Sequence, residues 1–259
     1  MIGTLFFIGT AGCGKTSLVK TYSEYLGDIG ADAITVNLDP AVLSTPYNPD
    51  VDVRNYVSIG KLLDNEALGP NGAIVAAMDM IAANLEPLLH EVNRHDPDYV
   101  LVDTPGQLEL FAFREVGPII LNSLTDSQKA AVFLLDPVIA QDSTGLASLL
   151  MLSVSSSLRL GVNTINVLSK ADVLSEDVRE RIVGYFEEPE EFVSSVFGRR
   201  GLVNKLTARF VEAVFDVAGV NQPIPLSSYE LFGLPELHAE IQRMFTGGEV
   251  EDPGSNVQD

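Results

Sequence analysis

Short apolar runs alternate with longer segments of helical periodicity along most of the chain. The runs are continuous in apolar residues and predict buried strands at residues 4–8, 33–37, 98–103, 130–136, 164–169 and 223–226. The segments between them carry apolar residues at helical spacing and predict helices at residues 17–26, 59–66, 74–93, 111–124, 141–160, 175–186, 201–218 and 234–245. Continuous apolar strands that alternate with helices predict an α/β fold, with a mostly parallel sheet covered by helices on both faces.

Three segments need separate interpretation. Residues 38–54 are polar, contain several prolines and predict a long loop of functional importance. Residues 246–259 are rich in glycine and acidic side chains and predict a disordered tail, so we expect one domain over residues 1–245. The stretch 144–162 is apolar but is interrupted by serines and by Arg159, which predicts a buried helix rather than a membrane span.

The composition narrows the classes of partner. Hydrophobic residues make up 46% of the chain, while the formal net charge is −20 and the pI is about 4.3. Such an acidic chain disfavours broad binding to nucleic acid or to an anionic membrane surface. Cys13 is the single cysteine, so no disulfide can form within the chain, and we expect a reducing, cytoplasmic location. The apolar N-terminus lacks a basic segment, and we expect a core strand there rather than a signal peptide.

The first predicted strand runs directly into a phosphate-binding motif. Residues 9–16 read Gly-Thr-Ala-Gly-Cys-Gly-Lys-Thr and match G-x-x-x-x-G-K-[ST] between a strand and a helix. Backbone N–H groups and the positive end of the helix face one point in such a loop and can hold a polyphosphate. We expect Lys15 to reach the β- and γ-phosphates and Thr16 to ligate Mg²⁺. We interpret Cys13 as a small lining residue rather than a redox group. The other lining residues are expected to be Gly12, Gly14 and Ser17.

A second polar group follows the predicted strand at 98–103. Asp103 ends that strand, where a P-loop enzyme places an acid near Mg²⁺, and Gly106 can offer a backbone N–H to a γ-phosphate. Gln107 could orient an attacking water or remain a solvated side chain, and the sequence leaves both open. An Asp-x-x-Gly run often marks only a turn, but its place after a strand favours the functional interpretation.

A third group predicts the base that is bound. The strand at 164–169 ends in Ser169-Lys170-Ala171-Asp172, a relaxed form of [NTS]-K-x-D. The Asp172 carboxylate can accept two N–H bonds from the edge of guanine, whereas adenine has no such pair of donors. The Lys170 stem can cover the base while its ammonium stays in water. Ser169 stands where Asn or Thr is more usual, yet its hydroxyl can still tie the loop with one hydrogen bond. Backbone donors after the last strand would complete the pocket at Ser227 and Ser228.

Taken together, these motifs resemble those of a GTPase, in the order and spacing of the GPN-loop GTPase family. The resemblance covers residues 1–245 and includes Asp39 and the run Gly69-Pro70-Asn71, which looks like the loop that gives this family its name. It implies a three-layer P-loop NTPase fold with an insertion over about residues 40–95. It also implies Mg²⁺-dependent hydrolysis of GTP to GDP and phosphate.

The resemblance further implies a homodimer whose packing the nucleotide controls. In it, Gly69, Pro70 and Asn71 of one chain would reach the phosphate site of the other. A local alternative stays open, because Asn71 could cap a helix that begins near Ala73, and both roles are compatible. The residues that would act in catalysis are Lys15, Asp39, Asn71 and Gln107, and the metal ligands would be Thr16, Asp39 and Asp103.

Asp39 is the acid that the resemblance places near the attacking water and the metal. A carboxylate there could accept a proton or position the water, and the sequence leaves open whether Asp39 or Gln107 does so. The local alternative is a simple Asp-Pro turn at the end of a strand.

The sequence is compatible with one further function and argues against two others. Hydrolysis could merely reset a GTP-dependent shape in an assembly factor with little turnover, and the family suggests roles in assembling larger complexes, RNA polymerase among them. A dimeric partitioning ATPase would carry a lysine where Thr10 stands and would lack the Lys-x-Asp motif. A small-molecule kinase would need an arginine-rich lid, which the sequence does not contain.

Overall fold

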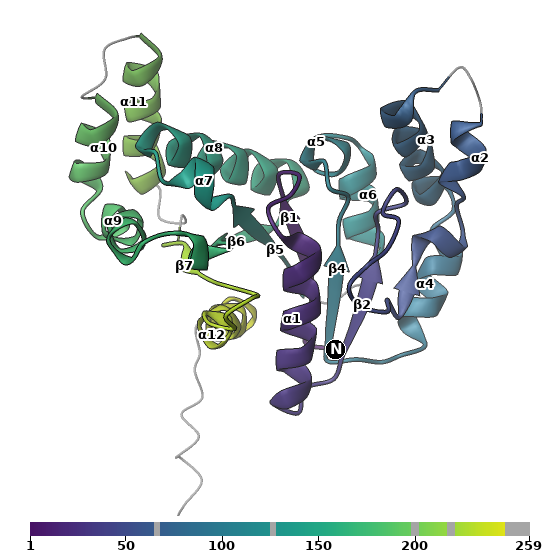
Figure 1. Ribbon diagram of the computed structural model, residues 1–259. Coiled ribbons are helices and arrows are strands. Elements are labelled where there is room, and N and C mark those ends of the chain that lie inside the picture. The colour runs from purple at the N-terminus through teal and green to yellow at the C-terminus, as the bar shows by residue number, and fades with distance from the viewer. Residues whose placement is uncertain (65–67, 125–127, 198–201, 217–220, 247–259) are drawn as a thin grey trace, which may run out of the picture.

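One sheet of seven strands organises the computed structural model, which describes residues 1–64, 68–124, 128–197, 202–216 and 221–246 (Figure 1). The strand order is β3-β2-β4-β1-β5-β6-β7. The strands are β1 Gly3–Gly9, β2 Ala33–Asn37, β3 Val51–Asp52, β4 Tyr99–Asp103, β5 Gln128–Leu135, β6 Asn163–Leu168 and β7 Ile224–Pro225. All the pairings between these strands are parallel, which confirms the predicted fold class.

Helices pack on both faces of the sheet, as the alternation of strands and helices predicts. The face with Leu5 and Phe7 of β1 is covered by α1 (Lys15–Asp28) and α12 (Leu234–Phe245). The face with Phe6 and Ile8 is covered by a larger group of helices, some of which pack mainly on other helices of the group. Its members are α2 Ile59–Leu63, α3 Pro70–Ala83, α4 Glu86–Asn93, α5 Leu108–Phe111, α6 Val116–Ser123, α7 Pro137–Ala140, α8 Ser143–Leu160, α9 Glu176–Glu187, α10 Pro189–Phe197 and α11 Leu202–Asp216.

The strand register brings the predicted polar groups to one edge of the sheet. Phe7 of β1 and Asn37 of β2 both pair with Asp103 of β4, so the carboxyl ends of these three strands lie side by side. Ligands of open parallel sheets bind at this edge. The fold therefore gathers the residues that follow β1, β2 and β4 into one place.

The predicted helix at 74–93 is wrong in its extent, because two helices occupy this region. Gly69 is the N-cap of α3 and Pro70 its first residue, so the helix begins earlier than predicted. It ends at Ala83, and α4 follows across a bend of 67°. Pro87 explains the break, because it has no N–H to donate and its ring would clash with the carbonyl of Ala83 in a continuous helix.

Other boundaries also differ from the predictions. The helix predicted at 111–124 is divided between α5 and α6, and the short strand β3 and helix α10 have no predicted counterpart. A strand of two residues shows no periodicity, so pattern analysis cannot find it. The predictions at residues 65–66, 201, 217–218 and 247–259, which include most of the predicted tail, lie outside the described residues.

Within the described residues, no single helix has the length and apolar character of a membrane span. In the same residues, α3 and α4 taken together have the required length and apolar composition, but they are separated by their bend of 67°.

A buried histidine makes the stability of the fold depend on pH. The Tyr22 hydroxyl is 2.9 Å from Nδ1 of His238, and the rings of Tyr25 and Tyr99 lie 5.8 and 6.0 Å from the imidazole. Burial lowers the pKa of His238 below its ordinary value. The unfolded state therefore binds a proton more readily, and the free energy of unfolding should fall as the pH drops below about 6.5.

The expected loss is about 1.4 kcal/mol for each unit by which the pKa is lowered. Urea unfolding between pH 7 and 5 measures it. His238→Gln should flatten the dependence, whereas the same change at the exposed His95 serves as the control. An equal slope in wild type and His238→Gln would show that this histidine is not responsible.

Candidate functional site

The loop between β1 and α1 has the backbone geometry of a phosphate cradle. Gly12 and Gly14 have φ angles of 78° and 102°, in the left-handed region that favours glycine. Gly14 is the N-cap of α1, and Lys15 and Thr16 form the start of that helix. The free amides of the first turn and the helix dipole therefore face the loop. This is the arrangement that the motif predicts.

Lys15 lies inside this loop rather than in solvent. Its side chain is buried, and Nζ donates to the carbonyl oxygens of Gly9 at 2.9 Å, Thr10 at 3.0 Å and Gly106 at 3.1 Å. The ammonium thus joins the phosphate loop to the segment after β4. It is a fixed positive charge at the point where the loop would hold phosphates.

Cys13 is fully buried beside Lys15. Burial raises the pKa of its thiol, and the nearby Lys15 ammonium only partly opposes this effect. A thiol with a raised pKa is a poor nucleophile, so these surroundings favour a lining role for Cys13 over a redox role.

Asp103 ends β4 in a buried position with an incomplete set of hydrogen bonds. Its Oδ2 accepts a hydrogen bond from the Tyr47 hydroxyl at 3.1 Å, while its buried Oδ1 has no partner. Burial raises the pKa of this carboxyl to about 6, although the nearby Thr16 hydroxyl, the hydrogen bond from Tyr47 and the charge of Lys15 act in the opposite direction. A buried acceptor without a partner is costly unless a ligand occupies it.

These surroundings fit Mg²⁺. Thr16 and Asp103 offer hydroxyl and carboxylate oxygens, the hard ligands that this ion prefers. Asp39 lies close enough to raise the pKa of Asp103 by charge repulsion. In the described part of the chain, no three His, Cys, Asp or Glu side chains gather as a metal cage. A Mg²⁺ ion here would therefore also need oxygens from phosphate and water.

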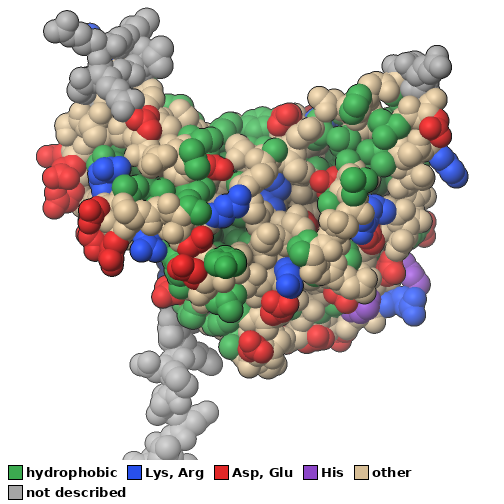
Figure 2. Space-filling model, in the orientation of Figure 1, with side chains coloured by type: hydrophobic (Ala, Val, Ile, Leu, Met, Phe, Trp, Pro, Cys, Tyr) green, Lys and Arg blue, Asp and Glu red, His purple; other side chains and the backbone are tan. Residues whose placement is uncertain are grey.

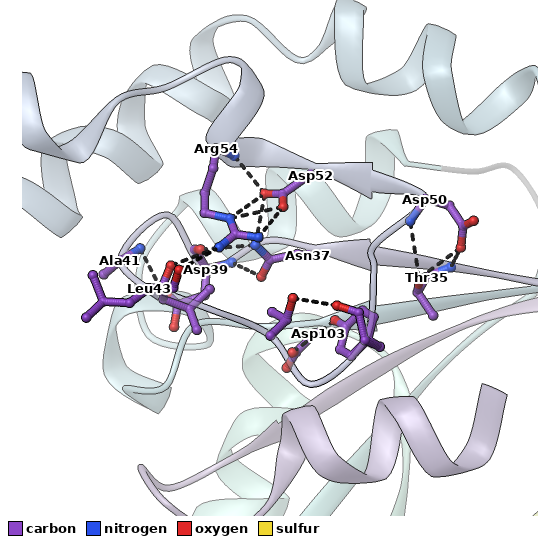
Figure 3. Close-up of polar contacts among 12 residues, drawn as sticks. Thr35, Asn37, Asp39, Ala41, Leu43, Asp50, Asp52, Arg54 and Asp103 are labelled. Carbon is purple, nitrogen blue, oxygen red and sulfur yellow. Dashed lines mark hydrogen bonds and ion pairs between the residues drawn. The ribbon is translucent and has the colours of Figure 1, made fainter. Parts of the chain in front are cut away.

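Asp39 is held against the segment after β4. Its Oδ2 accepts a hydrogen bond from the Gly106 N–H at 3.2 Å. Its Oδ1 accepts one from the Ala41 N–H at 2.8 Å, and Figure 3 shows this second bond. Since Lys15 binds the Gly106 carbonyl, both polar groups of Gly106 are engaged by predicted site residues. Gln107 follows at the N-cap of α5, half-buried, and its side chain has no hydrogen-bond partner among the described residues.

Two adjoining hollows have the extent needed for a nucleotide. One of about 280 Å³ is lined by predicted phosphate and metal residues, which are Gly12, Gly14, Lys15, Thr16, Ser17, Asp39 and Gly106. The other, of about 390 Å³, is lined by predicted base-binding residues, which are Ser169, Lys170, Asp172 and Ser228. Gly14, Ser17 and Lys170 line both. The structure therefore brings the phosphate and base motifs together, as expected at this edge of the sheet.

The loop after β6 is tied in place by its own side chains. The Ser169 hydroxyl donates to the Leu135 carbonyl at 3.0 Å, which confirms that serine can tie this loop. Lys170 has a φ of 48°, and its Nζ donates to the Gly12 carbonyl at 2.6 Å, so it bridges the two motifs. Ser227 is buried, and its Oγ accepts from the amides of Tyr229 and Glu230. Ser227 thus supports the turn, whereas Ser228 faces the cavity.

The Gly69-Pro70-Asn71 run lies at the start of α3, away from these hollows. The predicted cap role of Asn71 is wrong, because Gly69 occupies the N-cap position and Asn71 is an exposed helical residue. In the described part of the chain, none of the three residues lines either hollow. Figure 1 shows α3 beside α2, with α5 between it and the start of α1. The site of one chain therefore lacks its own Asn71.

Four residues of the site have no predicted role: Asn37, Tyr47, Asp52 and Arg54. They all come from β2 or from the stretch 38–54, whose polarity, prolines and length predicted a functional loop without assigning these residues a role. The contact from Tyr47 to Asp103 joins residues 56 apart, so it depends on the packing of the loop over β4.

Comparison with known proteins gives three kinds of match. Residues 7–247 match a family model described as a conserved hypothetical ATP binding protein. A GPN-loop GTPase of Pyrococcus abyssi is 39% identical over 184 residues, which are 70% of this chain and 73% of that protein. GPN-loop GTPase 3 of Dictyostelium discoideum is 35% identical over 254 residues, 95% of this chain and 88% of that protein.

The crystal structure of a Pyrococcus abyssi GTPase in its apo form is similar to this fold with a TM-score of 0.84. It is 30% identical in sequence, and the match covers 94% of this chain and 98% of that one. The relatives' names refer to GTP, whereas the description of the family model refers to ATP.

Proposed function

The chain belongs to the GPN-loop GTPase family, and from this premise we propose that it hydrolyses GTP to GDP and phosphate with Mg²⁺, in an active site that a second copy of the chain completes. One observation carries the proposal. The phosphate hollow and the base hollow adjoin, with Lys15 lining the first and Asp172 lining the second. A single guanine nucleotide could therefore contact both motifs.

The residues have distinct parts in the proposed reaction. Lys15 and the loop amides would hold the β- and γ-phosphates. Mg²⁺, held by Thr16 and Asp103 with Asp39 nearby, would neutralise charge on the phosphate oxygens when bound. The oxygen of a water would form a bond to the γ-phosphorus while the bond from this phosphorus to the bridging β–γ oxygen breaks. Asp39 or Gln107 would orient that water by accepting its hydrogen bond, and the proton that the water loses would pass to the Asp39 carboxylate or to an oxygen of the released phosphate.

The base pocket supports GTP over ATP. Asp172 lines the cavity, where its carboxylate can accept the N1–H and N2–H bonds of guanine. Adenine offers an acceptor at N1, which would leave the carboxylate without that pair of donors. For this reason we follow the names of the relatives rather than the description of the family model.

The placement of Asn71 supports a dimer. Asn71 is exposed and lines neither hollow of its own chain in the described residues, so a second copy would have to supply it. Apolar side chains are exposed on α3, on α6 and between α5 and α6: Met80, Ile119 and Phe113 are 50%, 44% and 39% exposed. α3 contacts α5 and α6, and Figure 2 shows hydrophobic surface where α3 lies. A second copy would cover this surface while its Asn71 reaches the phosphates.

A mixing experiment tests the dimer. Asn71→Ala and Lys15→Ala should each be nearly inactive alone, and an equimolar mixture should recover about a quarter of the wild-type GTPase rate per chain. Half of randomly paired dimers are mixed, and one of their two sites is intact. The control mixture is Lys15→Ala with Asp172→Asn. Each of these residues would bind the nucleotide held by its own chain, so both sites of a mixed dimer would stay defective. Absence of recovery in the first mixture would contradict the shared site, and absence of wild-type turnover would contradict the GTPase itself.

We also propose that the nucleotide changes the shape of the protein, so that it acts as an assembly switch in the cytoplasm. The Gly106 peptide supports this proposal, because its carbonyl binds Lys15 and its N–H binds Asp39. A γ-phosphate that accepts the Gly106 N–H would take it from Asp39, whereas a diphosphate, which does not reach this position, would leave the contact with Asp39 in place. The segment after β4 could then differ between the two nucleotide states.

A further inference from the structure

A polar network behind Asp39 involves residues that no catalytic motif includes. The short strand β3 pairs with β2 at the edge of the sheet, in a register that places Asn37 opposite Asp52. Asn37 is fully buried and Asp52 is 9% exposed, so this pair lies beneath the loop rather than in solvent. Buried polar groups of this kind are retained when they fix a geometry.

Asn37 holds the backbone of Asp39 from both sides. Its Oδ1 accepts a hydrogen bond from the Asp39 N–H at 3.0 Å, and its Nδ2 donates to the Asp39 carbonyl at 3.3 Å. The same Nδ2 donates to Oδ1 of Asp52 at 3.0 Å. The orientation of the Asn37 amide is thus set by Asp52, because only a donor can face that carboxylate.

Arg54 fixes Asp52 and also reaches the loop. Its Nε donates to Oδ1 and Oδ2 of Asp52 at 2.9 and 3.0 Å, and its Nη2 contacts Oδ2 at 2.5 Å (Figure 3). Its Nη1 donates to the carbonyls of Val42 at 3.1 Å and Leu43 at 3.4 Å. Burial alone would raise the pKa of Asp52, but the hydrogen bonds from Arg54 and Asn37 outweigh this effect and lower it. Asp52 therefore stays ionised and paired.

The segment that these bonds hold is irregular, and it is also tied to the rest of the site by the hydrogen bonds from the Gly106 N–H to Asp39 and from Tyr47 to Asp103. Residues 38–50 contain no helix or strand, and the Leu43 side chain is 97% exposed. Asn37 holds the start of the segment at Asp39, and Arg54 holds it again at Val42 and Leu43. The Asp39 carboxylate lies between these two anchors, with its Oδ1 bonded to the Ala41 N–H.

We propose that Arg54 is a positioning residue for Asp39, acting through Asp52 and Asn37 and through the carbonyls of Val42 and Leu43. The inference rests on the proposed GTPase activity. It gives the ion pair between Asp52 and Arg54 at the sheet edge a role in orienting a reacting group, beside any role in stability. Asp52 is buried and Arg54 partly buried, and ion pairs removed from water contribute little net stability compared with apolar residues of the same size, which is consistent with a geometric purpose.

Arg54→Ala tests the proposal by its effect on turnover. We expect kcat for GTP to fall about 10- to 100-fold, as for other residues that orient a reacting side chain, with KM changed by less than about threefold. Arg54→Lys should lie between wild type and Arg54→Ala, since an ammonium cannot form the forked pair, and it carries the test if Arg54→Ala does not fold. The control is Arg159→Ala, which removes an exposed ion pair with Glu115.

Two further measurements separate positioning from a general loss of structure. Single-turnover hydrolysis should fall by less in the Arg54→Ala, Asp39→Asn double variant than the product of the two single effects, because both act through one carboxylate. Hydrogen exchange should accelerate at the Ala41 amide in Arg54→Ala while the amides of β1 keep their rates. The inference would be overturned if the rate loss of the double variant equalled the product of the two single losses, or if Arg54→Ala left kcat unchanged. It would also be overturned if hydrogen exchange accelerated equally at Ala41 and in β1. Absence of GTP turnover in wild type would instead reject the proposed function.

Discussion

Lys15→Ala is expected to weaken GTP binding at least 100-fold. Hydrogen bonds from a charged donor contribute about 1.5–3 kcal/mol each, and Lys15 would make two with the β- and γ-phosphates. The chain carries a formal net charge of −20, so the surrounding field cannot replace this ammonium. Titration with a fluorescent GTP analogue in the presence of Mg²⁺ measures the loss.

The design must separate lost binding from lost folding. Removing the ammonium leaves the carbonyls of Gly9, Thr10 and Gly106 without this donor, which also destabilises the loop. Lys15→Met keeps the apolar stem and should fold while binding GTP equally poorly. Lys129→Ala, on β5, is the matched control and should bind like wild type. GTP affinity within about threefold of wild type in Lys15→Met would show that nucleotide does not bind at this loop.

Asp172→Asn should change the preferred nucleotide from GTP to XTP, the nucleoside triphosphate of xanthine. The carboxylate accepts from two guanine donors, and the amide of asparagine offers one acceptor and one donor in the same place. Xanthine carries a carbonyl where guanine carries its amino group, so the asparagine variant should favour XTP. We expect GTP affinity to fall about 10³-fold, because a polar site rejects a ligand that leaves its groups unpaired.

Competition among GTP, XTP and ATP for the fluorescent analogue checks this exchange. Asp177→Asn, which changes an exposed carboxylate on α9, should leave the order of affinities as in wild type. Tighter binding of ATP than of GTP to wild type would refute the guanine assignment while leaving the phosphate loop in place. Equal GTP affinity in wild type and Asp172→Asn would remove Asp172 from the pocket.

The strands, the phosphate loop and the base motif could be predicted because their signals are local. A buried parallel strand shows as an apolar run, and the loop from Gly9 to Thr16 needs its residue types in one order. The carboxyl ends of parallel strands meet at one edge, so the clustering of Lys15, Asp39, Asp103 and Asp172 followed from topology. Their catalytic and metal roles stay predictions.

The parts that could not be predicted depend on register and packing. The pairing of Asn37 with Asp52 exists only because β3 joins the sheet edge at that register, and β3 is too short to show a pattern. The bond from Tyr47 to Asp103 requires the loop to fold back over β4. For Asn71, local capping rules favoured a cap, but Pro70 is better suited to the first helical position and moved the start of α3.

The shortness of β3 and β7 limits how this protein can associate. Each outermost strand has two residues, and Pro225 in β7 has no amide hydrogen to offer. Long unpaired outer strands are templates on which another chain can extend a sheet, and short or proline-containing ones prevent such growth. In the proposed dimer the two copies would therefore meet through helical surfaces, where partners can separate and rejoin without adding strand to strand.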